Sequence, residues 1–342
     1  MKLIKTEQAV GHVICHDITR IVKDQEKGAA FRKGHIVTEE DIPVLLAIGK
    51  EHLYVWEKQE GILHEDEAAR ILAAACKNDG MRLTEPKEGK IEVFAERDGL
   101  FVADVERLAA INSIDNMMIA TRNTLQYVKA GDKLAGTRII PLVIEEEKMK
   151  AVTAIADESR PILEVKPMVR TQAGVVTTGS EVYKGRIQDT FTPVIEEKLH
   201  TLGARMTMHI TVSDEKEQIV EAIRSMKEKG CELILCTGGM SVDPDDLTPA
   251  AIRDSGANII TYGAPVLPGA MFLLGYFEDG TPIMGLPGCV MYAGATVFDM
   301  ILPRVLADVK VTKQDIVKLG NGGLCLGCSV CHYPNCGYGK GV

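Results

Sequence analysis

The sequence lacks the apolar segments that would take a chain out of the cytoplasm or into a membrane. Residues 1–14 contain no signal-like apolar core, so secretion is not expected. Two stretches without charged residues, 255–277 and 281–298, have the length of a membrane span of about 20 residues. Glycine and proline interrupt both stretches, which favours buried strands and loops. We therefore expect a cytoplasmic protein with no membrane segment.

The sequence also lacks clustered positive charge. It has 39 lysine and arginine residues against 48 aspartate and glutamate residues, a formal net charge of −9, and no block of basic residues. A nucleic-acid-binding surface needs a concentrated basic patch. We therefore do not expect nucleic acid as a partner. Internal repeats and low-complexity segments are absent as well.

The length predicts more than one domain. A chain of 342 residues is too long for one ordinary core, and 46% hydrophobic with 25% charged residues is typical of a globular protein. We expect an α/β protein in four parts, with the boundary before the main domain at residues 157–167. The parts are a mixed α/β segment (1–62), a helix with a β-rich subdomain (63–160), a three-layer α/β domain (166–310) and a cysteine-rich tail (311–342).

Hydrophobic periodicity places the elements. In the first half we expect helices over 39–48 and 65–76, strands over 11–14, 53–56, 91–94, 100–105, 126–128 and 137–144, and a charged connection at 145–150. In the second half, strands over 173–176, 205–212, 231–236, 272–277 and 282–285 alternate with helices. Those helices cover 190–202, a segment opened by an Asp214–Glu217 capping box, a segment opened by Thr248 and Pro249, and 292–306.

Three short glycine-containing loops are the strongest functional signal. The first loop (residues 177–181, TTGSE) and the second loop (237–241, TGGMS) each follow a strand, and a third loop (285–289, GLPGC) comes later. Glycine and hydroxyl residues directly after a strand leave several backbone N–H groups free to bind one anion. Loops at the carboxyl ends of neighbouring strands meet where open α/β sheets bind ligands. The sequence therefore predicts a phosphate-binding site at this edge.

Carboxylates accompany these loops, at Glu181, Asp189, Asp243, Asp245 and Asp246. They are too many for a bare anion site. Either several are solvated loop charges, or some hold Mg²⁺ beside a phosphate. For Asp189, the alternative interpretation is that it is only the N-cap of the helix that follows it.

The order of these motifs resembles a known family. GRIQDT (185–190), DPDDLTPA (243–250), a proline–glycine loop (PGA, 268–270) and LPG (286–288) follow as they do in the molybdopterin-binding fold of molybdopterin adenylyltransferase, molybdopterin molybdotransferase and gephyrin. The resemblance covers about residues 166–306. Residues 11–18 and 45–55 also resemble the N-terminal portion of the molybdotransferases. The competence/damage-inducible protein A family, which acts on nucleotides, is a more distant relative.

The resemblance implies particular roles for residues. Asp246 and Asp189 would lie near the pterin and the reacting phosphate or metal. The residues implied to contact the pterin are Thr178, Gly179, Ser180, Glu181, Gly238, Gly239, Met240, Ser241, Asp243, Pro268, Gly269, Pro287 and Gly288. Two positions depart from the family. Ala270 stands where molybdotransferases have lysine, which argues against molybdate insertion, and Cys289 stands where asparagine is common.

The resemblance implies a molybdopterin-binding protein of molybdenum cofactor biosynthesis. As an enzyme, it would transfer adenylyl or molybdate at the pterin, using ATP or molybdate and Mg²⁺ held by Asp246 and Asp189. A second hypothesis is a non-catalytic carrier or chaperone that delivers the cofactor to a molybdenum enzyme. A third is a nucleotide-processing enzyme. The family also implies a homo-oligomer.

The tail carries a separate signal. Four of the nine cysteines, Cys325, Cys328, Cys331 and Cys336, lie within twelve residues with spacing C-x2-C-x2-C-x4-C. This spacing is near the ferredoxin run, which favours an iron–sulfur cluster. Zinc is the alternative, held by the four thiolates or by three of them with His332. The remaining interpretation is a disordered tail with spare thiols.

Overall fold

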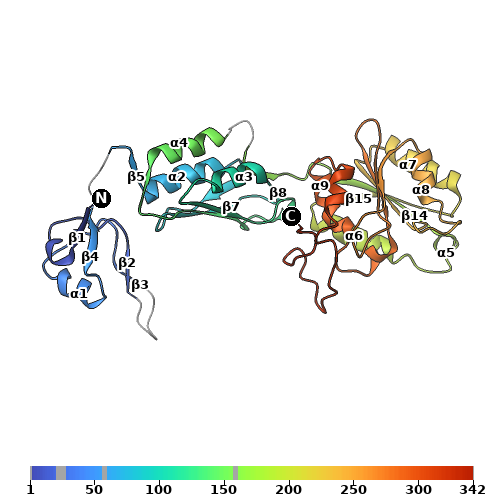
Figure 1. The fold of residues 1–342 in the computed structure, drawn as a ribbon. Coiled ribbons are helices and arrows are strands. Elements are labelled where there is room, and N and C mark those ends of the chain that lie inside the picture. Colours follow the sequence, from blue (N-terminus) through green and yellow to red (C-terminus); the bar gives the residue numbers. More distant parts are fainter. Residues whose placement is uncertain (1, 21–27, 56–59, 157–160, 342) are drawn as a thin grey trace. The chain divides into compact units, whose positions relative to one another are not determined.

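The computed structural model describes residues 2–20, 28–55, 60–156 and 161–341. The chain divides into two compact units, which are described separately (Figure 1). The first unit comprises Met1–Arg97, Ala103–Arg122 and Ala130–Glu164, and the second comprises Asp98–Val102, Asn123–Lys129 and Val165–Val342. The expected boundary at 157–167 includes residues 157–160, which lie outside the described residues, and the four-part division stays a prediction.

The first unit begins with small antiparallel pairs around one helix. Strand β1 (Lys2–Lys5) pairs with β4 (His52–Val55), and β2 (Ile18–Arg20) pairs with β3 (Gly28–Phe31). The 3-10 helix η1 (Thr6–Gln8) and helix α1 (Asp41–Ala47) complete this part. Helix α1 and strand β4 were predicted. The predicted strand extended to Trp56, which lies outside the described residues. The strand predicted at 11–14 contributes only isolated bridges, Val13 to Ile36 and Ile14 to Val55.

The remainder of the first unit is a four-stranded antiparallel sheet with helices. Its strands are β6 (Met81–Leu83), β7 (Lys90–Ala95), β11 (Lys133–Ile139) and β9 (Met117–Thr121), in that spatial order. The short pair β5 (Ile62–His64) and β12 (Val143–Glu145) and helices α2 (Glu65–Cys76), α3 (Val105–Asn112) and α4 (Glu146–Ile155) complete it.

Helix α2 has the predicted bounds, but α3 and α4 were not predicted. The segment 145–150 is the start of α4 and not a loop, because Met149 and Val152, one helical turn apart, are buried. Its charged residues lie on the remaining faces of the helix. The charge content of the sequence concealed this apolar stripe.

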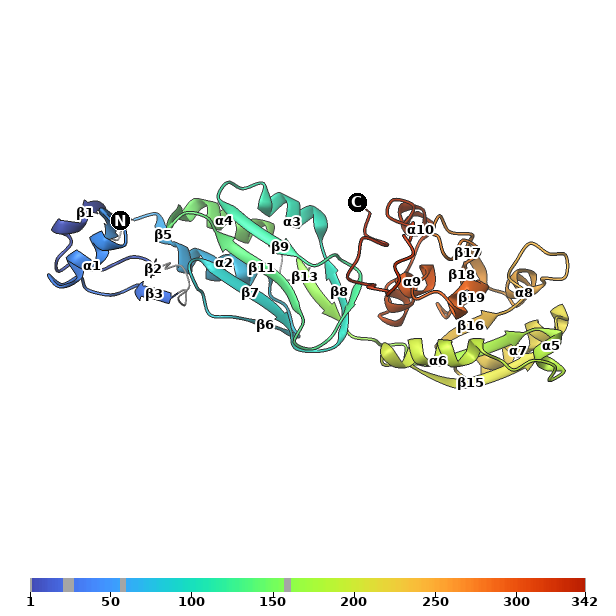
Figure 2. The same ribbon diagram turned by 90° about the horizontal axis from the view of Figure 1, so that it is seen from below.

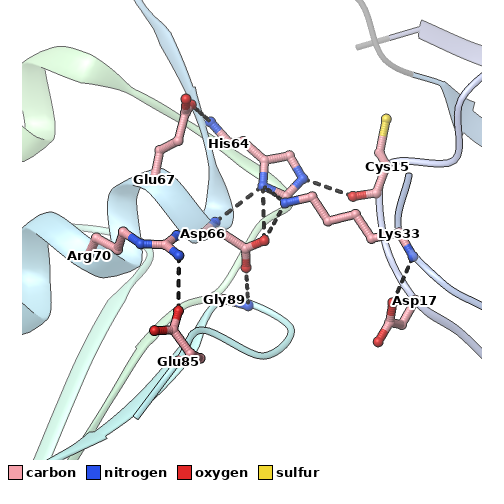
Figure 3. A network of polar contacts seen from close by, with 9 residues as sticks. All are labelled: Cys15, Asp17, Lys33, His64, Asp66, Glu67, Arg70, Glu85 and Gly89. Atoms are coloured by element: carbon pink, nitrogen blue, oxygen red, sulfur yellow. Dashed lines mark hydrogen bonds and ion pairs between the residues drawn. The ribbon is translucent and has the colours of Figure 1, made fainter. Parts of the chain in front are cut away.

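A polar network holds the start of α2 against the preceding part of the unit (Figure 3). The His64 ring, which is 2% exposed, donates from Nε2 to the Cys15 carbonyl at 2.8 Å and accepts at Nδ1 from the Asp66 amide at 3.2 Å. Lys33 Nζ lies 3.0 Å from the same Nδ1 and forms an ion pair with Asp66. These partners require a neutral imidazole with its proton on Nε2, and burial lowers the pKa of His64.

The second unit is built on a six-stranded sheet in the order β15-β14-β16-β19-β18-β17. Figure 2 labels β15 at one edge and β17 at the other, and Figure 1 labels β14. Strands β15 (Arg205–Val212), β14 (Gln172–Thr178), β16 (Leu233–Thr237) and β19 (Pro282–Leu286) are parallel. At the other edge, β18 (Leu273–Tyr276) runs antiparallel to β19, and β17 (Asn258–Tyr262) runs antiparallel to β18. The unit also holds a smaller sheet of β10 (Gln126–Val128), β8 (Gly99–Ala103) and β13 (Leu163–Lys166).

Helices cover both faces of the six-stranded sheet, so the predicted three-layer α/β architecture is confirmed (Figure 1). Helices α6 (Phe191–Thr201) and α9 (Val297–Leu306) pack on one face through Ile195, Leu199 and Phe298. Helices α7 (Lys216–Glu228) and α8 (Thr248–Asp254) pack on the other face. The shorter helices are α5 (Ser180–Tyr183), η2 (Gly288–Met291) and α10 (Lys313–Lys318).

Three predicted helix starts in this unit need correction. Helix α9 begins at Val297 with a Thr296–Asp299 capping box, so the segment from 292 is not yet part of it. Helix α8 has Leu247 as N-cap, which makes Thr248 its first residue. The Asp214–Glu217 capping box does not form, because the Asp214 side chain accepts from the Ser180 amide instead. Among the described residues, no helix is long and apolar enough to cross a membrane.

Candidate ligand site at the carboxyl edge of the sheet

The register of the sheet brings the predicted loops together. Thr177 pairs with Thr237, and Thr237 pairs with Leu286, so the first, second and third loops leave the same edge. Leu273 pairs antiparallel with Gly285, which places the proline–glycine loop at this edge as well. The convergence inferred from strand–loop order is therefore present in the fold.

The first and second loops touch through their backbones. Gly238 has φ of +83°, and a Cβ there would lie 2.3 Å from the carbonyl oxygen of Thr178. The Thr248 hydroxyl donates to the Gly238 carbonyl at 2.9 Å and lies 3.4 Å from the Thr178 hydroxyl. Only glycine fits this approach, because an L-residue would be strained at that φ and would clash with main-chain atoms. The two loops thus form one continuous wall.

Carboxylates of the chain hold an amide of each loop. Asp214 Oδ2 accepts from the Ser180 amide at 2.7 Å, and Asp246 Oδ2 accepts from the Ser241 amide at 2.8 Å. The Tyr262 hydroxyl donates to the carbonyls of Met240 and Ser241 at 3.0 and 3.2 Å. Burial and the charge of Asp246 raise the pKa of Tyr262. Sequence reasoning missed Asp214 and Tyr262 as loop partners, because their contacts depend on strand order.

The other predicted site residues differ in exposure. Asp243, Asp245 and Glu181 are exposed, whereas Asp246 is half-buried. Met240 is 5% exposed, and a Cβ on Gly285 would lie 2.6 Å from the Met240 sulfur, so its side chain packs in the core and not at the surface.

The third loop and the proline–glycine loop form the other side of the edge. Pro287 is buried, and Gly288 is exposed, where an added Cβ would meet no atom within 4 Å. Gly269 has φ of +122°, and a Cβ there would meet Val297 Cγ1 at 2.8 Å. The carbonyl of Pro268 accepts from the Tyr338 hydroxyl at 3.1 Å.

Asp189 lies two residues before α6 and is held by several donors. The N-cap of α6 is Thr190 and not Asp189, but Asp189 Oδ1 accepts from the amides of Phe191 and Thr192 in the first turn at 2.9 and 3.0 Å. Its Oδ2 accepts from the Thr192 hydroxyl at 2.5 Å and lies 3.7 Å from His209 Nε2. Burial opposes ionisation, but the hydrogen bonds outweigh it and lower the pKa of Asp189. Sequence reasoning missed His209, because an alternating strand gives no sign of what lies beside it.

The structure does not gather the four tail thiols. Cys328 and Cys331 are exposed, and Cys325 and Cys336 are half-buried. Across the described part of the chain, which includes all four, no three side chains of histidine, cysteine, aspartate or glutamate lie close enough to hold a metal ion. The Cys325 amide donates to the Leu267 carbonyl at 2.8 Å, which places this cysteine beside the proline–glycine loop.

This arrangement predicts two fast-reacting thiols in the native protein. The thiolate is the reactive species, so exposure and pKa control the rate. Cys328 and Cys331 are exposed, whereas burial raises the pKa of Cys76 to about 12. We expect Ellman's reagent to modify Cys328 and Cys331 first, and the remaining buried thiols only after unfolding. The buried thiols are Cys15, Cys76, Cys231 and Cys236.

Protection of Cys328 and Cys331 would contradict that arrangement. If iron or zinc were released as they reacted, the tail would hold the metal that its spacing predicted. Release would be followed by a chromogenic chelator in the same experiment.

Two family models match parts of the chain. Residues 174–307 match the family model described as "Probable molybdopterin binding domain". Residues 3–57 match a model described as "Domain of unknown function (DUF8806)". Residues 174–307 are therefore similar to the molybdopterin-binding family, as the motifs predicted.

The curated relatives are similar over a short stretch. A CinA-like protein of Mycobacterium tuberculosis (strain ATCC 25177 / H37Ra) is 41% identical over 81 residues, which is 23% of this chain and 19% of that protein. A CinA-like protein of Mycobacterium sp. (strain MCS) is 39% identical over 91 residues, covering 26% of this chain and 21% of that protein. The match thus spans about a fifth of the length of these relatives.

Solved structures show a weaker likeness. The molybdopterin biosynthesis enzyme MoaB from Thermus thermophilus has 23% identity and a TM-score of 0.34, covering 41% of this chain and 96% of that one. The tungsten cofactor synthesizing protein MoaB from Pyrococcus furiosus has 20% identity and a TM-score of 0.36, covering 43% and 99%. At these identities and TM-scores, the likenesses add nothing to the family match.

Proposed function

We propose that residues 166–310 bind molybdopterin at the carboxyl edge of the sheet, as part of molybdenum cofactor biosynthesis. The ligand's phosphate would lie against the first and second loops. The observation that carries this proposal is the main-chain approach of Gly238 to Thr178, which only glycine permits. Loops of this kind present backbone amides to anions. The family match over residues 174–307 supports the same ligand class.

Asp246 is the residue best suited to a metal-bound phosphate. Among the described residues, its side chain accepts a hydrogen bond only at Oδ2, from the Ser241 amide. The residue is half-buried. Its other oxygen would hold Mg²⁺, a cation that prefers carboxylate and phosphate oxygens. When bound, the cation would neutralise phosphate charge. Asp189 is more fully engaged, since both of its oxygens accept hydrogen bonds from α6.

The chain lacks the lysine that the resembling molybdotransferases have after the proline–glycine pair. No lysine occurs between Lys229 and Lys310, and Ala270 occupies the position where the resembling family has lysine. This observation favours a second candidate function, a carrier that holds the pterin for a molybdenum enzyme. Transfer of adenylyl from ATP, or of molybdate, is the enzymatic alternative. The homo-oligomer stays a prediction, and the tail metal is not part of this proposal.

The test is an anaerobic titration of the full chain with molybdopterin, followed by separation from free ligand and pterin fluorescence. We expect near-stoichiometric retention. With Mg²⁺ present, Asp246→Asn should weaken the Kd about tenfold or more, because a neutral amide attracts the cation less. Asp245→Asn is the matched control, since Asp245 is an exposed carboxylate of the same segment, and it should bind as the wild type does.

Each outcome decides between hypotheses. Without retained pterin in the wild type, the proposal is wrong, and hydrolysis of nucleotides with Mg²⁺ would support the nucleotide-processing alternative. Turnover after addition of ATP or molybdate would identify an enzyme. Stable retention without turnover would identify a carrier.

A further inference from the structure

A cluster of polar side chains lies beneath the first loop, on the face of the sheet that α6 covers. Its members come from three strands and from the start of α6. His209 Nε2 lies 2.9 Å from the Thr177 hydroxyl and 3.3 Å from the Thr192 hydroxyl. Thr177 and Thr192 are 3% and 6% exposed. The Thr237 hydroxyl, 3.4 Å from that of Thr177, closes the cluster on the side of β16.

The carboxylate of Asp189 determines which hydroxyls of this cluster donate. Asp189 Oδ2 can only accept a hydrogen bond, and the Thr192 hydroxyl donates to it at 2.5 Å. Thr192 has then donated its single proton and can only accept from His209. An Nε2–H on His209 satisfies this requirement, whereas an unprotonated Nε2 would face the Thr192 oxygen as a second acceptor. With its proton on Nε2, His209 can donate to the hydroxyls of both threonines.

The Thr177 hydroxyl follows the same logic. In this tautomer it accepts from His209 at 2.9 Å and donates to Asp189 Oδ2 at 3.4 Å. Asp189 Oδ2 thus receives both threonine hydroxyls, and His209 fixes the orientation of both. An N-cap needs only the two amides bound by Oδ1, so these additional donors are not explained by capping α6.

We propose that His209 is a positioning residue that sets the orientation of Asp189 for the ligand on the first loop. It acts through the hydroxyls of Thr177 and Thr192 and does not touch the ligand itself. This inference rests on the proposed binding of molybdopterin. Its physical basis is that a functional carboxylate held by surrounding hydrogen bonds contributes more than one that must be ordered on binding.

The experiment measures molybdopterin affinity of full-length variants. His209→Leu removes the donor, and we expect its Kd to be about tenfold weaker or more. His209→Gln restores an N–H donor at a similar distance and should stay within about threefold of the wild type. His200→Leu is the control, because it makes the same substitution at an exposed position of α6 and should change nothing.

A double-mutant cycle separates positioning from simple stabilisation of the fold. In an Asp189→Asn background, His209→Leu should add less than about a twofold loss, since its target is already removed. An equal loss in both backgrounds, or wild-type affinity of His209→Leu, would overturn the inference. If the wild type itself binds no pterin, the proposed function fails instead. Circular dichroism of each variant confirms that it is folded, and His209→Gln keeps the test valid if the leucine variant is not.

Discussion

The Gly238→Ala variant should bind molybdopterin with a Kd at least about 100-fold higher than that of the wild type. Misplacing a functional group by about 1 Å can have an effect of about this size. The added Cβ would lie 2.3 Å from the carbonyl oxygen of Thr178 and 2.7 Å from its hydroxyl. A backbone carbonyl cannot rotate away as a flexible side chain can. The first and second loops must therefore separate, and the amides of both would no longer meet at one anion.

Some loss of stability should accompany this change. A left-handed conformation costs a non-glycine residue about 1–2 kcal/mol, and overpacking adds about 1–3 kcal/mol. The control is Gly337→Ala in the same unit, where an added Cβ would meet no atom within 4 Å. Titration with molybdopterin and thermal unfolding would be measured on both variants. Wild-type affinity of Gly238→Ala would show that the contact between the loops is not needed for binding.

The Glu65→Gln variant should be more stable than the wild type above pH 7, by about 3–4 kcal/mol at the usual 1.4 kcal/mol per pKa unit. Glu65 is the first residue of α2 and only 5% exposed. Burial, together with the charge of Asp66, raises its pKa from 4.5 to about 7. Glutamine has the shape of the protonated acid and carries no charge to bury.

Glu65 lowers folding stability as pH rises, because its pKa is higher in the folded state than in the unfolded state. Below pH 4.5 both states hold the proton, so Glu65 has no unfavourable effect there. As pH rises from 4.5 to about 7, the unfolded chain loses this proton first, and folding stability falls. Above pH 7 the full difference persists. Neutral His64 has the opposite trend, since its lowered pKa reduces stability as pH falls, but both proteins carry His64 and the comparison cancels it.

Calorimetry at pH 4.5 and pH 8 would measure the difference, with hydrogen exchange identifying the transition that contains α2. Glu106→Gln is the matched control, because Glu106 is an exposed carboxylate in the first turn of α3. There the helix dipole favours the charged form, so the substitution should lower stability by about 0.3–1 kcal/mol. A Glu65→Gln variant that is less stable at pH 8 would contradict the prediction and indicate an ionised, well-paired carboxylate.

The sequence alone predicted the layered α/β architecture of the second unit and the edge that holds the candidate site, but it missed strand β17. Apolar runs of strand length alternating with helical patterns specify parallel strands with helices on both faces. Loops that follow such strands must leave one edge, so the convergence of residues 177–181 and 237–241 follows from chain order. The glycines at 238 and 239 were predicted to let a ligand approach closely; in the structure, a Cβ at Gly238 would meet the Thr178 carbonyl, and a Cβ at Gly239 would meet the Thr248 hydroxyl.

Only the tertiary structure decided which side chains serve that edge. Asp214, Tyr262 and His209 reach it from distant segments, and such contacts depend on strand order and register. The same holds for exposure: Met240 is in the core, Glu65 is buried at a helix start where charge is normally solvated, and Cys328 and Cys331 are exposed. Local patterns indicate the type of an element, but its ends and the environment of its side chains also depend on packing between elements, which no single segment encodes.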